Sequence, residues 1–400
     1  MNDHTGGCHL EHDTGIGNDP QPRPPAGEYK DDLVKELLHS LAPSHLGTLM
    51  AELGQPAFRA RQLLDWLYLH PVENWEEMAN LPRALRERLS QRFDLQGLEL
   101  LERQISGDGT RKFLFELRDG GTIESVIIPM TDHVTFCLST QIGCAMACSF
   151  CATARGGLVR NLEPGEIIQQ VLRLQRDLAD EPLPGGTGHP NVVFMGMGEP
   201  LDNFPALETS IGILLDPECL GFSRRRVRIS TSGPGDGLHR LLASDLNVGL
   251  TISLGGSNDA ERKAVMPVPG RTSVAEVLDL AERYGRRHGR KGTVAWVLIK
   301  DRTDHPDQAR RLATLLRRRP FKVNLIPLNP LDDRDQTPPG QERILAFQRI
   351  LVDEGIDTFI RASGGTDIAA ACGQLRRRAA RTASPKNAPP EGEGRQGNDS

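Results

Sequence analysis

The sequence predicts an α/β protein built on a partial (βα) barrel, preceded by a small helical domain and a β-hairpin segment. Three observations support this prediction. From Val134 onward, strand-like apolar runs alternate with helical patterns, as in a parallel sheet with outer helices. The stretch before Val134 changes from helical spacing to two β-rich runs around a turn. Polar or glycine-rich residues follow several strand-like runs, and parallel barrels carry their chemistry at those ends.

Taken in order, the patterns divide the chain into a tail, two small segments, the barrel and a second tail. The predicted parts are a disordered tail (1–28), a helical domain (29–95), a β-hairpin segment (96–130), the barrel (131–376) and a disordered tail (377–400). Both tails are rich in Gly, Pro and polar residues without periodicity, so they lack the apolar surface that drives folding.

Leucines at helical spacing define the helical domain, and a turn defines the hairpin. The leucine pattern includes Leu33, Leu37, Leu38, Leu41, Leu63, Leu64, Leu67, Leu81, Leu85 and Leu89. The hairpin joins Lys112–Leu117 to Thr122–Ile128 through the turn at Arg118–Gly121. Spacing alone places Glu124 on the solvent-facing side of this hairpin.

The barrel prediction rests on seven strand-like runs with helical patterns between them. The predicted strands are Val134–Leu138, Asn191–Met195, Val227–Thr231, Gly249–Leu254, Thr293–Ile299, Lys322–Ile326 and Thr358–Ile360. The predicted helices include Pro164–Leu178, Val274–Arg287, Gln308–Arg318 and Gln341–Asp353.

The composition excludes several classes of protein. With 400 residues, 38% hydrophobic and 25% charged, the chain resembles a soluble globular protein. It contains no apolar run of membrane-spanning length and no secretory signal pattern. Seven cysteines, an odd number, favour a reducing cytoplasm over a disulfide framework. The net charge of -5 argues against a uniformly basic nucleic-acid binder, although arginine-rich clusters leave room for a local basic face.

The most informative motif is Cys144-Ala-Met-Ala-Cys148-Ser-Phe-Cys151, which follows the first barrel strand. Three thiolates can hold three irons of a four-iron cluster and leave the fourth iron open to a small molecule. S-adenosylmethionine, bound there through its amino and carboxylate groups, could be cleaved by an electron from the cluster. A zinc site is the alternative, but structural zinc usually takes four ligands in two pairs, and no second pair is present.

Further polar groups follow the later strands. Met195-Gly-Met-Gly-Glu-Pro200 lacks the third glycine of a dinucleotide-binding loop, but Glu199 could accept a hydrogen bond from an ammonium group. Three more segments combine small and polar residues at equivalent strand ends, which suggests a polar ring around one ligand. They are Ser230–Gly233, Ser253–Gly256 and Asn324–Asn329. Cys137 and Cys372 stand alone, and lone cysteines are usually inert.

Taken together, these motifs resemble the RlmN/Cfr family of radical-SAM RNA methyltransferases. The resemblance covers roughly residues 30–376. It rests on Phe136–Cys151, Met195–Leu201, Arg224–Gly233, Val323–Pro330 and Ala370–Leu375. The family's fold is a partial barrel preceded by a small helical RNA-binding domain, and the helical segment Phe58–Tyr68 fits that domain.

The resemblance implies a specific chemistry. One [4Fe-4S] cluster would be held by Cys144, Cys148 and Cys151. Two molecules of S-adenosylmethionine would be used per turnover: one methylates Cys372, and the second is cleaved to a radical that removes hydrogen from that methyl group. The methylene unit would add to carbon 2 of an adenine. Cys137 would then resolve the adduct through a transient disulfide with Cys372, and Glu124 would accept a proton.

The resemblance also assigns the S-adenosylmethionine contacts. They are Gly198, Glu199, Ser230, Ser253, Leu254, Gly255 and Asn329. The chain departs from the family pattern where Gly255 replaces a histidine, where Ala295–Trp296 replaces a Glu-Tyr pair, and in Ala362–Asp367, which lacks an arginine and some acidic residues.

The implied substrates are RNAs. Family members act on an adenine of 23S rRNA in the peptidyl-transferase region and on the adenine beside the tRNA anticodon. Carbon-8 methylation of the rRNA adenine is the close alternative, and a divergent paralogue with another RNA target is a further one. A noncatalytic metal-bearing RNA-binding module is a distant alternative. The other expectations are an electron donor such as flavodoxin, no membrane association, a cytoplasmic location and a monomer.

Overall fold

The computed structural model describes residues 35–184, 188–267, 272–331 and 334–376. The predicted tails, 1–28 and 377–400, lie outside the described residues. The described residues from Glu36 onward belong to one compact unit. None of the described helices is both long enough and apolar enough to cross a membrane.

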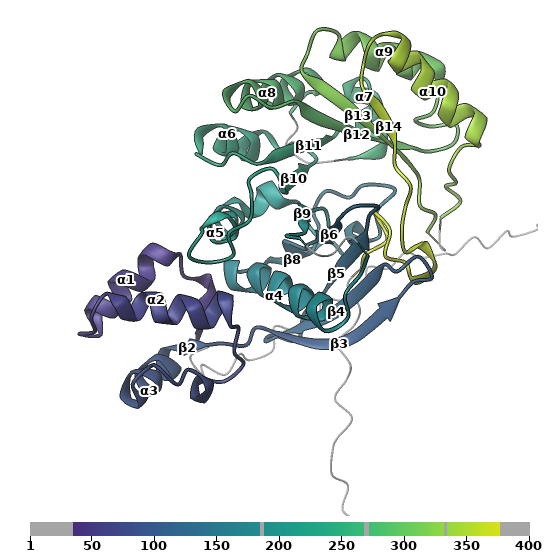
Figure 1. Ribbon diagram of the computed structural model, residues 1–400. Helices are drawn as coiled ribbons and strands as arrows, with labels where there is room; N and C mark the ends of the chain where they lie inside the picture. Colours follow the sequence, from purple (N-terminus) through teal and green to yellow (C-terminus); the bar gives the residue numbers. More distant parts are fainter. Residues whose placement is uncertain (1–34, 185–187, 268–271, 332–333, 377–400) are drawn as a thin grey trace, which may run out of the picture. The chain divides into compact units, whose positions relative to one another are not determined.

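The first elements of this unit are short helices around a leucine-rich core (Figure 1). They are α1 (Pro43–Glu52), α2 (Phe58–Leu64), a single π-helical turn (Asp65–Leu69) and α3 (Arg83–Arg92). The short strands β1 (Glu36–Leu37) and β2 (Phe93–Asp94) pair in parallel and close this segment. The predicted helical leucines Leu63 and Leu89 are fully buried, because they lie on the inward side of their helices. The predicted helical pattern at Leu37 and Leu38 is wrong, since Leu37 lies in β1 and Leu38 begins a 3-10 helix of three residues; Leu33 lies outside the described residues.

Within the described residues, the main sheet has ten strands in the order β14-β13-β12-β11-β10-β9-β6-β5-β4-β3. Strand β6 and strands β9 to β14 run parallel, which confirms the predicted partial barrel. Their bounds are β6 (Val134–Cys137), β9 (Asn191–Phe194), β10 (Val227–Thr231), β11 (Gly249–Ser253), β12 (Gly292–Leu298), β13 (Phe321–Pro327) and β14 (Thr358–Ile360).

The segment before the barrel is a three-stranded antiparallel meander, not the two-stranded hairpin that the sequence predicts. Strands β4 (Arg111–Leu117) and β5 (Thr122–Pro129) form the expected hairpin, β3 (Leu98–Ile105) pairs with β4, and β5 pairs with β6. The meander therefore extends the barrel sheet. Strand β3 escapes sequence reasoning because it is an edge strand that mixes charged and apolar residues and is mostly exposed or half-buried.

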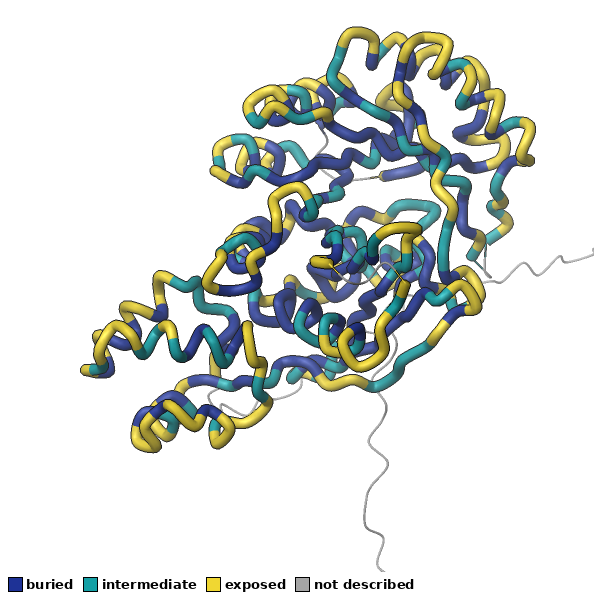
Figure 2. The backbone as a smooth tube through the Cα atoms, viewed as in Figure 1, coloured by how far each residue is buried: buried dark blue, intermediate teal, exposed yellow. Residues whose placement is uncertain are grey.

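Helices cover the outer face of the parallel strands (Figures 1 and 2). They are α4 (Pro164–Asp180), α5 (Phe204–Leu215), α6 (Gly235–Ala243), α8 (Val274–Arg287), α9 (Pro306–Leu316) and α10 (Gln341–Asp353). The short helix α7 (Asp259–Val265) lies instead beside the strand ends, where its Arg262 contacts the carbonyls of Ser253 and Leu254. Helix α4 begins with a capping box, in which Glu163 and Glu166 each satisfy a backbone N–H of the first turn.

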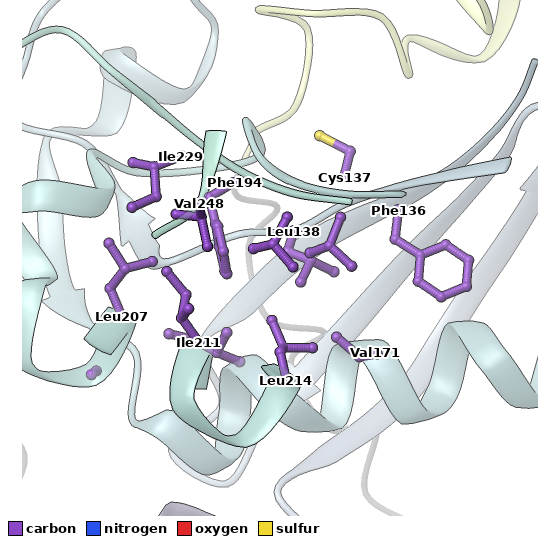
Figure 3. Packing of buried hydrophobic residues seen from close by; sticks show 14 of the residues in the cluster. Phe136, Cys137, Leu138, Val171, Phe194, Leu207, Ile211, Leu214, Ile229 and Val248 are labelled. Atoms are coloured by element: carbon purple, nitrogen blue, oxygen red, sulfur yellow. The ribbon is translucent and has the colours of Figure 1, made fainter. Parts of the chain in front are cut away.

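Side-chain alternation along β6 separates the core from the barrel interior. Phe136 and Leu138 point toward α4 and α5, where they join Val171, Leu214 and other buried residues, whereas Cys137 points to the opposite side of the sheet (Figure 3). This is the period-two alternation of a strand. A one-residue shift in register would exchange the thiol for an aromatic ring.

Two short strands complete the described architecture. Strand β7 (Gln141–Gly143) pairs with β8 (Leu158–Asn161) in a separate antiparallel ladder. The loop between them carries all three clustered cysteines. The sequence did not predict this ladder, because each strand is only three or four residues long.

Candidate active site

The β7–β8 ladder holds the two ends of the three-cysteine loop close together. Gly143 has a φ of 76°, and a Cβ atom at this position would lie 1.9 Å from the carbonyl oxygen of Gly157. The amide of Cys144 donates to that same carbonyl at 3.0 Å. Only glycine therefore allows the two ends of the loop to approach this closely.

The three clustered thiols lie close enough to influence one another electrostatically. Burial raises the pKa of Cys144 to about 12, with Glu199 and Cys151 adding to the shift. Burial also raises the pKa of Cys148, with further contributions from Cys151 and Cys144. All three are free cysteines. Iron binds the thiolate form, so cluster binding at this loop is coupled to the loss of protons from buried thiols.

The donor set fits a cluster better than a single ion. In the described parts of the chain, no three His, Cys, Asp or Glu side chains converge as they would around one metal ion. A cubane cluster accepts each thiolate on a different iron, so its ligands need not converge on one point. Three free thiols on one loop match such a cluster, with one iron left without a protein ligand.

The segment around Cys372 is hydrogen-bonded to the three-cysteine loop. The amide of Ala152 donates to the carbonyl of Gly373 at 2.7 Å, and the Thr153 hydroxyl donates to the carbonyl of Leu375 at 2.6 Å. The side chain of Asn329, which follows β13, donates to the carbonyl of Cys372 at 2.9 Å. Residues more than 200 positions apart in the sequence are thereby fixed beside one another.

The meander holds the other side of this segment. Ser106 Oγ donates to Asp367 at 2.6 Å, and the amide of Gly365 donates to Asp108 at 2.9 Å. Lys112 Nζ donates to the carbonyl of Ala369 at 3.3 Å. We call these three contacts the meander latch. It explains why the sheet extends beyond the parallel strands: the extension supports the Cys372 segment.

Cys137 and Cys372 line one cavity of about 400 Å³ in the barrel interior. Burial raises the pKa of Cys137 to about 12, with Cys372 as the next contributor. Burial also raises the pKa of Cys372 to about 11, and Cys151 adds to this shift. The Cys372 side chain is exposed to the cavity although protein surrounds it. Its thiol therefore interacts electrostatically both with Cys151 and with Cys137.

Glu124 is fully buried, so its sequence-based placement on a solvent-facing surface is wrong. One oxygen of its carboxylate accepts a hydrogen bond from the amide of Arg376 at 2.9 Å, and the other lies 3.4 Å from Lys112 Nζ. Residues from the far end of the chain cover this face of the hairpin. Periodicity within the hairpin could not reveal that cover.

Glu199 is buried and is held by donors from two strand ends. Its carboxylate accepts hydrogen bonds from Thr231 Oγ1 at 2.6 Å, from Ser232 N and Oγ at 2.8 and 2.9 Å, and from Leu201 N at 3.0 Å. Burial raises its pKa even though these donors oppose the shift. Gly198 has a φ of 106°, and a Cβ there would lie 2.7 Å from Gln141.

The remaining predicted cofactor contacts lie at the ends of β10 and β11. Ser230 and Ser253 are half-buried at the ends of β10 and β11, and Leu254 and Gly255 are buried directly after β11. The buried Arg262 guanidinium donates to the carbonyls of Ser253 and Leu254 at 3.2 and 2.7 Å, and also to the carbonyl of Ser232. Arg262 therefore joins the ends of two neighbouring strands.

The structure gives physical reasons for the departures from the family pattern. A Cβ at Gly255, where φ is 72°, would lie 2.4 Å from the sulfur of Met266, so Met266 fills the place of a side chain. Trp296 is fully buried, donates to the carbonyl of Thr303 at 2.8 Å and packs against Phe347. A Cβ at Gly364 would lie 2.8 Å from the Thr110 hydroxyl, at the meander latch.

Sequence reasoning missed the residues that hold the site together. They are Gln141, Thr231, Ser232, Arg262 and Lys112. The side-chain oxygen of Gln141 accepts a hydrogen bond from the backbone amide of Glu199 at 2.7 Å. Thr231 and Ser232 lie inside the Ser230–Gly233 motif and could have been found there, because buried carboxylates need nearby donors. Arg262 and Lys112 carry no local signal, since their partners come from other segments.

Comparisons with known proteins identify the class of protein. The family model of the ribosomal RNA large subunit methyltransferase N-terminal domain matches residues 37–95, and that of the radical SAM superfamily matches residues 138–313. A radical SAM methyltransferase from Sphaerobacter thermophilus has a similar structure, with a TM-score of 0.80 and 38% identity over 85% of this chain and 99% of that one. Fold and site thus define a radical SAM enzyme.

Two curated relatives narrow the class. The dual-specificity RNA methyltransferase RlmN of Anaeromyxobacter dehalogenans is 44% identical over 84% of this chain and 91% of its own length. A probable RlmN of Symbiobacterium thermophilum is 42% identical over 88% of this chain and 94% of its own. This chain belongs to the RlmN family of radical SAM RNA methyltransferases.

Proposed function

We propose that this protein methylates carbon 2 of an adenine in 23S rRNA, in the peptidyl-transferase region, and of the adenine beside the tRNA anticodon, through an S-methylated Cys372. The observation that carries the proposal is the position of Cys372. Its segment is hydrogen-bonded to the three-cysteine loop, and its thiol shares a cavity with Cys137. The names of the RlmN relatives support action on two classes of RNA.

Cys144, Cys148 and Cys151 would hold one [4Fe-4S] cluster, and the strand-end residues from Gly198 to Asn329 would surround S-adenosylmethionine. When bound, the two groups supply reductive cleavage of the carbon–sulfur bond and hence a radical able to remove hydrogen from an unactivated methyl group. Carbon 2 of adenine is too electron-poor for direct polar methyl transfer, so the reaction requires such a route.

The two isolated cysteines take complementary roles. Cys372 attacks the methyl group of S-adenosylmethionine: its sulfur–carbon bond forms, the bond to the sulfonium sulfur breaks, and the thiol proton is lost. Glu124 accepts the proton that leaves carbon 2 of the adenine adduct, and the adduct gives up its unpaired electron, which the iron–sulfur cluster would take back. Cys137 then attacks the Cys372 sulfur, so a disulfide forms while the sulfur–methylene bond breaks and the carbon takes a proton. A dithiol reductant must reopen the disulfide, because Cys372 has to be a thiol again before it can accept the next methyl group.

The other parts of the chain would serve RNA binding and electron supply. We infer that the helical segment at 29–95 binds RNA, that residues 96–130 connect it to the barrel at 131–376 through the meander, and that a flavodoxin-like protein donates electrons. The enzyme would act as a monomer in the cytoplasm. Carbon-8 methylation of the rRNA adenine is the second candidate, because the same motifs serve both positions.

An anaerobic assay tests the proposal. The reconstituted protein is incubated with S-adenosylmethionine, a reductant and either a 23S rRNA fragment of the peptidyl-transferase region or a tRNA anticodon stem-loop. Mass spectrometry of the digested RNA should show 2-methyladenosine from both RNAs. Methylation at carbon 8 alone would support the second candidate. The absence of methyladenosine from both RNAs, with iron present in the protein, would contradict an RNA methyltransferase with these targets.

A further inference from the structure

The cavity that contains Cys137 and Cys372 has a strongly basic wall. Five cationic side chains line it: Arg225, Arg226, Arg228, Lys322 and Arg361. No Asp or Glu is among the described residues of its wall. The whole chain carries a net charge of -5, so this concentration of positive charge is local. Such a cavity attracts anions and focuses their approach.

Four of the five cations lie near the amino ends of strands, at the end of the barrel opposite the predicted cofactor residues, whereas Arg361 directly follows β14. Arg228 and Lys322 are the second residues of β10 and β13, near the amino ends of these strands. The predicted cofactor contacts Ser253 and Asn329, in contrast, lie at or beyond the carboxyl ends of their strands. None of the proposed cluster or S-adenosylmethionine ligands lines the cavity. Cys372 does line it, so this residue can be reached from both ends.

Three of the cations repel one another without a compensating partner. Burial lowers the pKa of Arg228, and Arg361 adds to the shift. Burial likewise lowers the pKa of Lys322, and Arg228 and Arg361 add to it. Among the described residues, none of the ion pairs includes these three side chains. Asp357 lies close enough to affect Lys322, but its carboxylate is paired with Lys291 at 2.9 Å.

Two polar atoms in the same wall also lack partners. In the described structure, Thr251 Oγ1 and Asn324 Oδ1 are buried and form no hydrogen bond, and Thr251 is only 1% exposed. Unsatisfied buried polar atoms are costly, so they are usually satisfied by a ligand or by water. Asn324 lies two residues after Lys322 on β13, hence on the same side of the sheet and one step nearer the cofactor end.

We propose that this cavity is the subsite for the target nucleotide of single-stranded or unpaired RNA. Arg228, Lys322 and Arg361 bind the backbone phosphates that flank the adenosine. Asn324 Oδ1 accepts a hydrogen bond from the exocyclic amine of the base. The inference rests on the proposed function and extends it to the recognition of substrate. Enzymes that modify a base must take it out of the stack and hold it in such a pocket, and asparagine is a common partner of the adenine amine. The nucleotide enters from the amino ends of the strands, whereas the cofactor binds at the carboxyl ends.

The test measures RNA binding directly, without turnover. Fluorescence anisotropy of a labelled anticodon stem-loop is recorded for the reconstituted wild-type protein and for Lys322→Met and Arg361→Gln. Each variant should bind about tenfold more weakly, because a hydrogen bond to a charged group is lost, and the slope of log affinity against log salt should fall by about 0.7 for each phosphate contact removed. Arg310→Gln, on an exposed cation of α9 that pairs with Asp307, should match the wild type.

Chemical changes in the RNA assign each contact. When neutral methylphosphonates replace the phosphates on both sides of the target adenosine, the wild type should lose more affinity than any single substitution costs. Lys322→Met should lose less from the same replacement than the wild type does, because one of its phosphate contacts is already gone. Replacing the target adenosine by purine riboside, which lacks the amine, should weaken the wild type but not Asn324→Leu. Arg361→Lys and Lys322→Arg, which keep the charge, should retain most of the affinity and show that the cavity still folds.

Three outcomes separate the subsite from the proposed function. If Lys322→Met and Arg361→Gln keep the wild-type affinity and salt slope while the wild type methylates RNA, the subsite is wrong and the function stands. If the methylphosphonate RNA weakens the wild type and the variants equally, the phosphates are bound elsewhere, which also overturns the subsite. If the wild type methylates neither RNA, the proposed function fails, whatever the variants bind.

Discussion

Glu199 shows how one residue can join several loops. Four donors from Leu201, Thr231 and Ser232 point at its carboxylate, and a carboxylate has about four acceptor positions. Its own amide donates to Gln141, at the entrance of the three-cysteine loop. Glu199 therefore links the segment after β9 and the end of β10 to Gln141, just before the three-cysteine loop.

Replacing Glu199 by alanine should destabilise the fold. The change leaves buried donors without an acceptor, so the free energy of unfolding should fall by on the order of 3 kcal/mol. Chemical denaturation followed by circular dichroism measures it. Glu208→Gln, at an exposed position of the neighbouring helix α5, is the control and should change stability by less than about 0.5 kcal/mol. An equal effect of both substitutions would mean that the Glu199 network contributes little.

Cys137→Ala should trap a covalent protein–RNA adduct. Without the resolving thiol, the bond between Cys372 and the RNA cannot be released, so the adduct should persist on a denaturing gel and disappear after ribonuclease treatment. Cys219→Ala is the matched control, because Cys219 is buried and free but lies outside the cavity. Normal turnover by Cys137→Ala would remove this residue from the mechanism.

At the scale of elements, the meander supports the segment that carries Cys372. Its β3–β4 turn and strand β4 hold the segment that carries Cys372. Burial raises the pKa of Asp108, but the amides of Thr110 and Gly365 outweigh it and hold the pKa below its usual value. The Ser106 hydroxyl lowers the pKa of Asp367. Both carboxylates therefore strengthen the meander latch only while they are ionised.

The meander latch should open in acid. Because the folded pKa of each carboxyl lies below its unfolded value of about 3.9, the latch contributes fully above that pH and is lost as the pH falls through the folded pKa. Hydrogen exchange over residues 363–372, corrected for intrinsic rates, should show less protection near pH 3 than near pH 5. Asp367→Asn should reduce this protection near pH 3 and near pH 5. Asp353 is exposed on α10, so Asp353→Asn should leave the protection unchanged at both pH values. Unchanged protection in Asp367→Asn would contradict the latch.

The parallel strands were predictable, and the surroundings of the site were not. Val227–Thr231 and Thr358–Ile360 are found with the bounds that the sequence predicts, because strands buried within a barrel form continuous apolar runs between turns. Glu124 was misplaced because the residues that cover it lie some 250 positions away. The basic cavity wall was missed for the same reason: Arg228, Lys322 and Arg361 come from three different strands or strand ends, and only the closed sheet brings them together.

At the scale of the whole molecule, Gln169 on α4 ties the helical segment to the barrel. Its amide donates to the carbonyl of Leu95 at 2.8 Å and accepts from the amide of Gly97 at 2.7 Å, and it lies 3.2 Å from the His39 ring. Burial lowers the pKa of His39 to about 4, partly opposed by a backbone hydrogen bond to Leu67. The junction therefore contains a neutral histidine at neutral pH.

This histidine should make the fold sensitive to mild acid. Its pKa is about 4 when folded and about 6.5 when unfolded, so between these values the unfolded chain binds more protons and stability falls as the pH falls. The contribution over that window is about 3 kcal/mol. Urea unfolding measured from neutral to mildly acidic pH should show that the free energy of unfolding falls less with pH in His39→Gln than in the wild type. His45→Gln, at an exposed position, should follow the wild type, and parallel curves for all three would contradict the prediction.

The most direct test of the central claim follows the hydrogens of the transferred methyl group. The reconstituted protein is incubated with RNA and S-adenosylmethionine that carries a fully deuterated methyl group. Mass spectrometry of the digested RNA then gives the deuterium content of the methyladenosine. Transfer through a methyl group on Cys372 removes one hydrogen before the carbon reaches the base, so the product should carry two of the three deuterium atoms. A product that retains all three would show direct transfer and contradict the role assigned to Cys372.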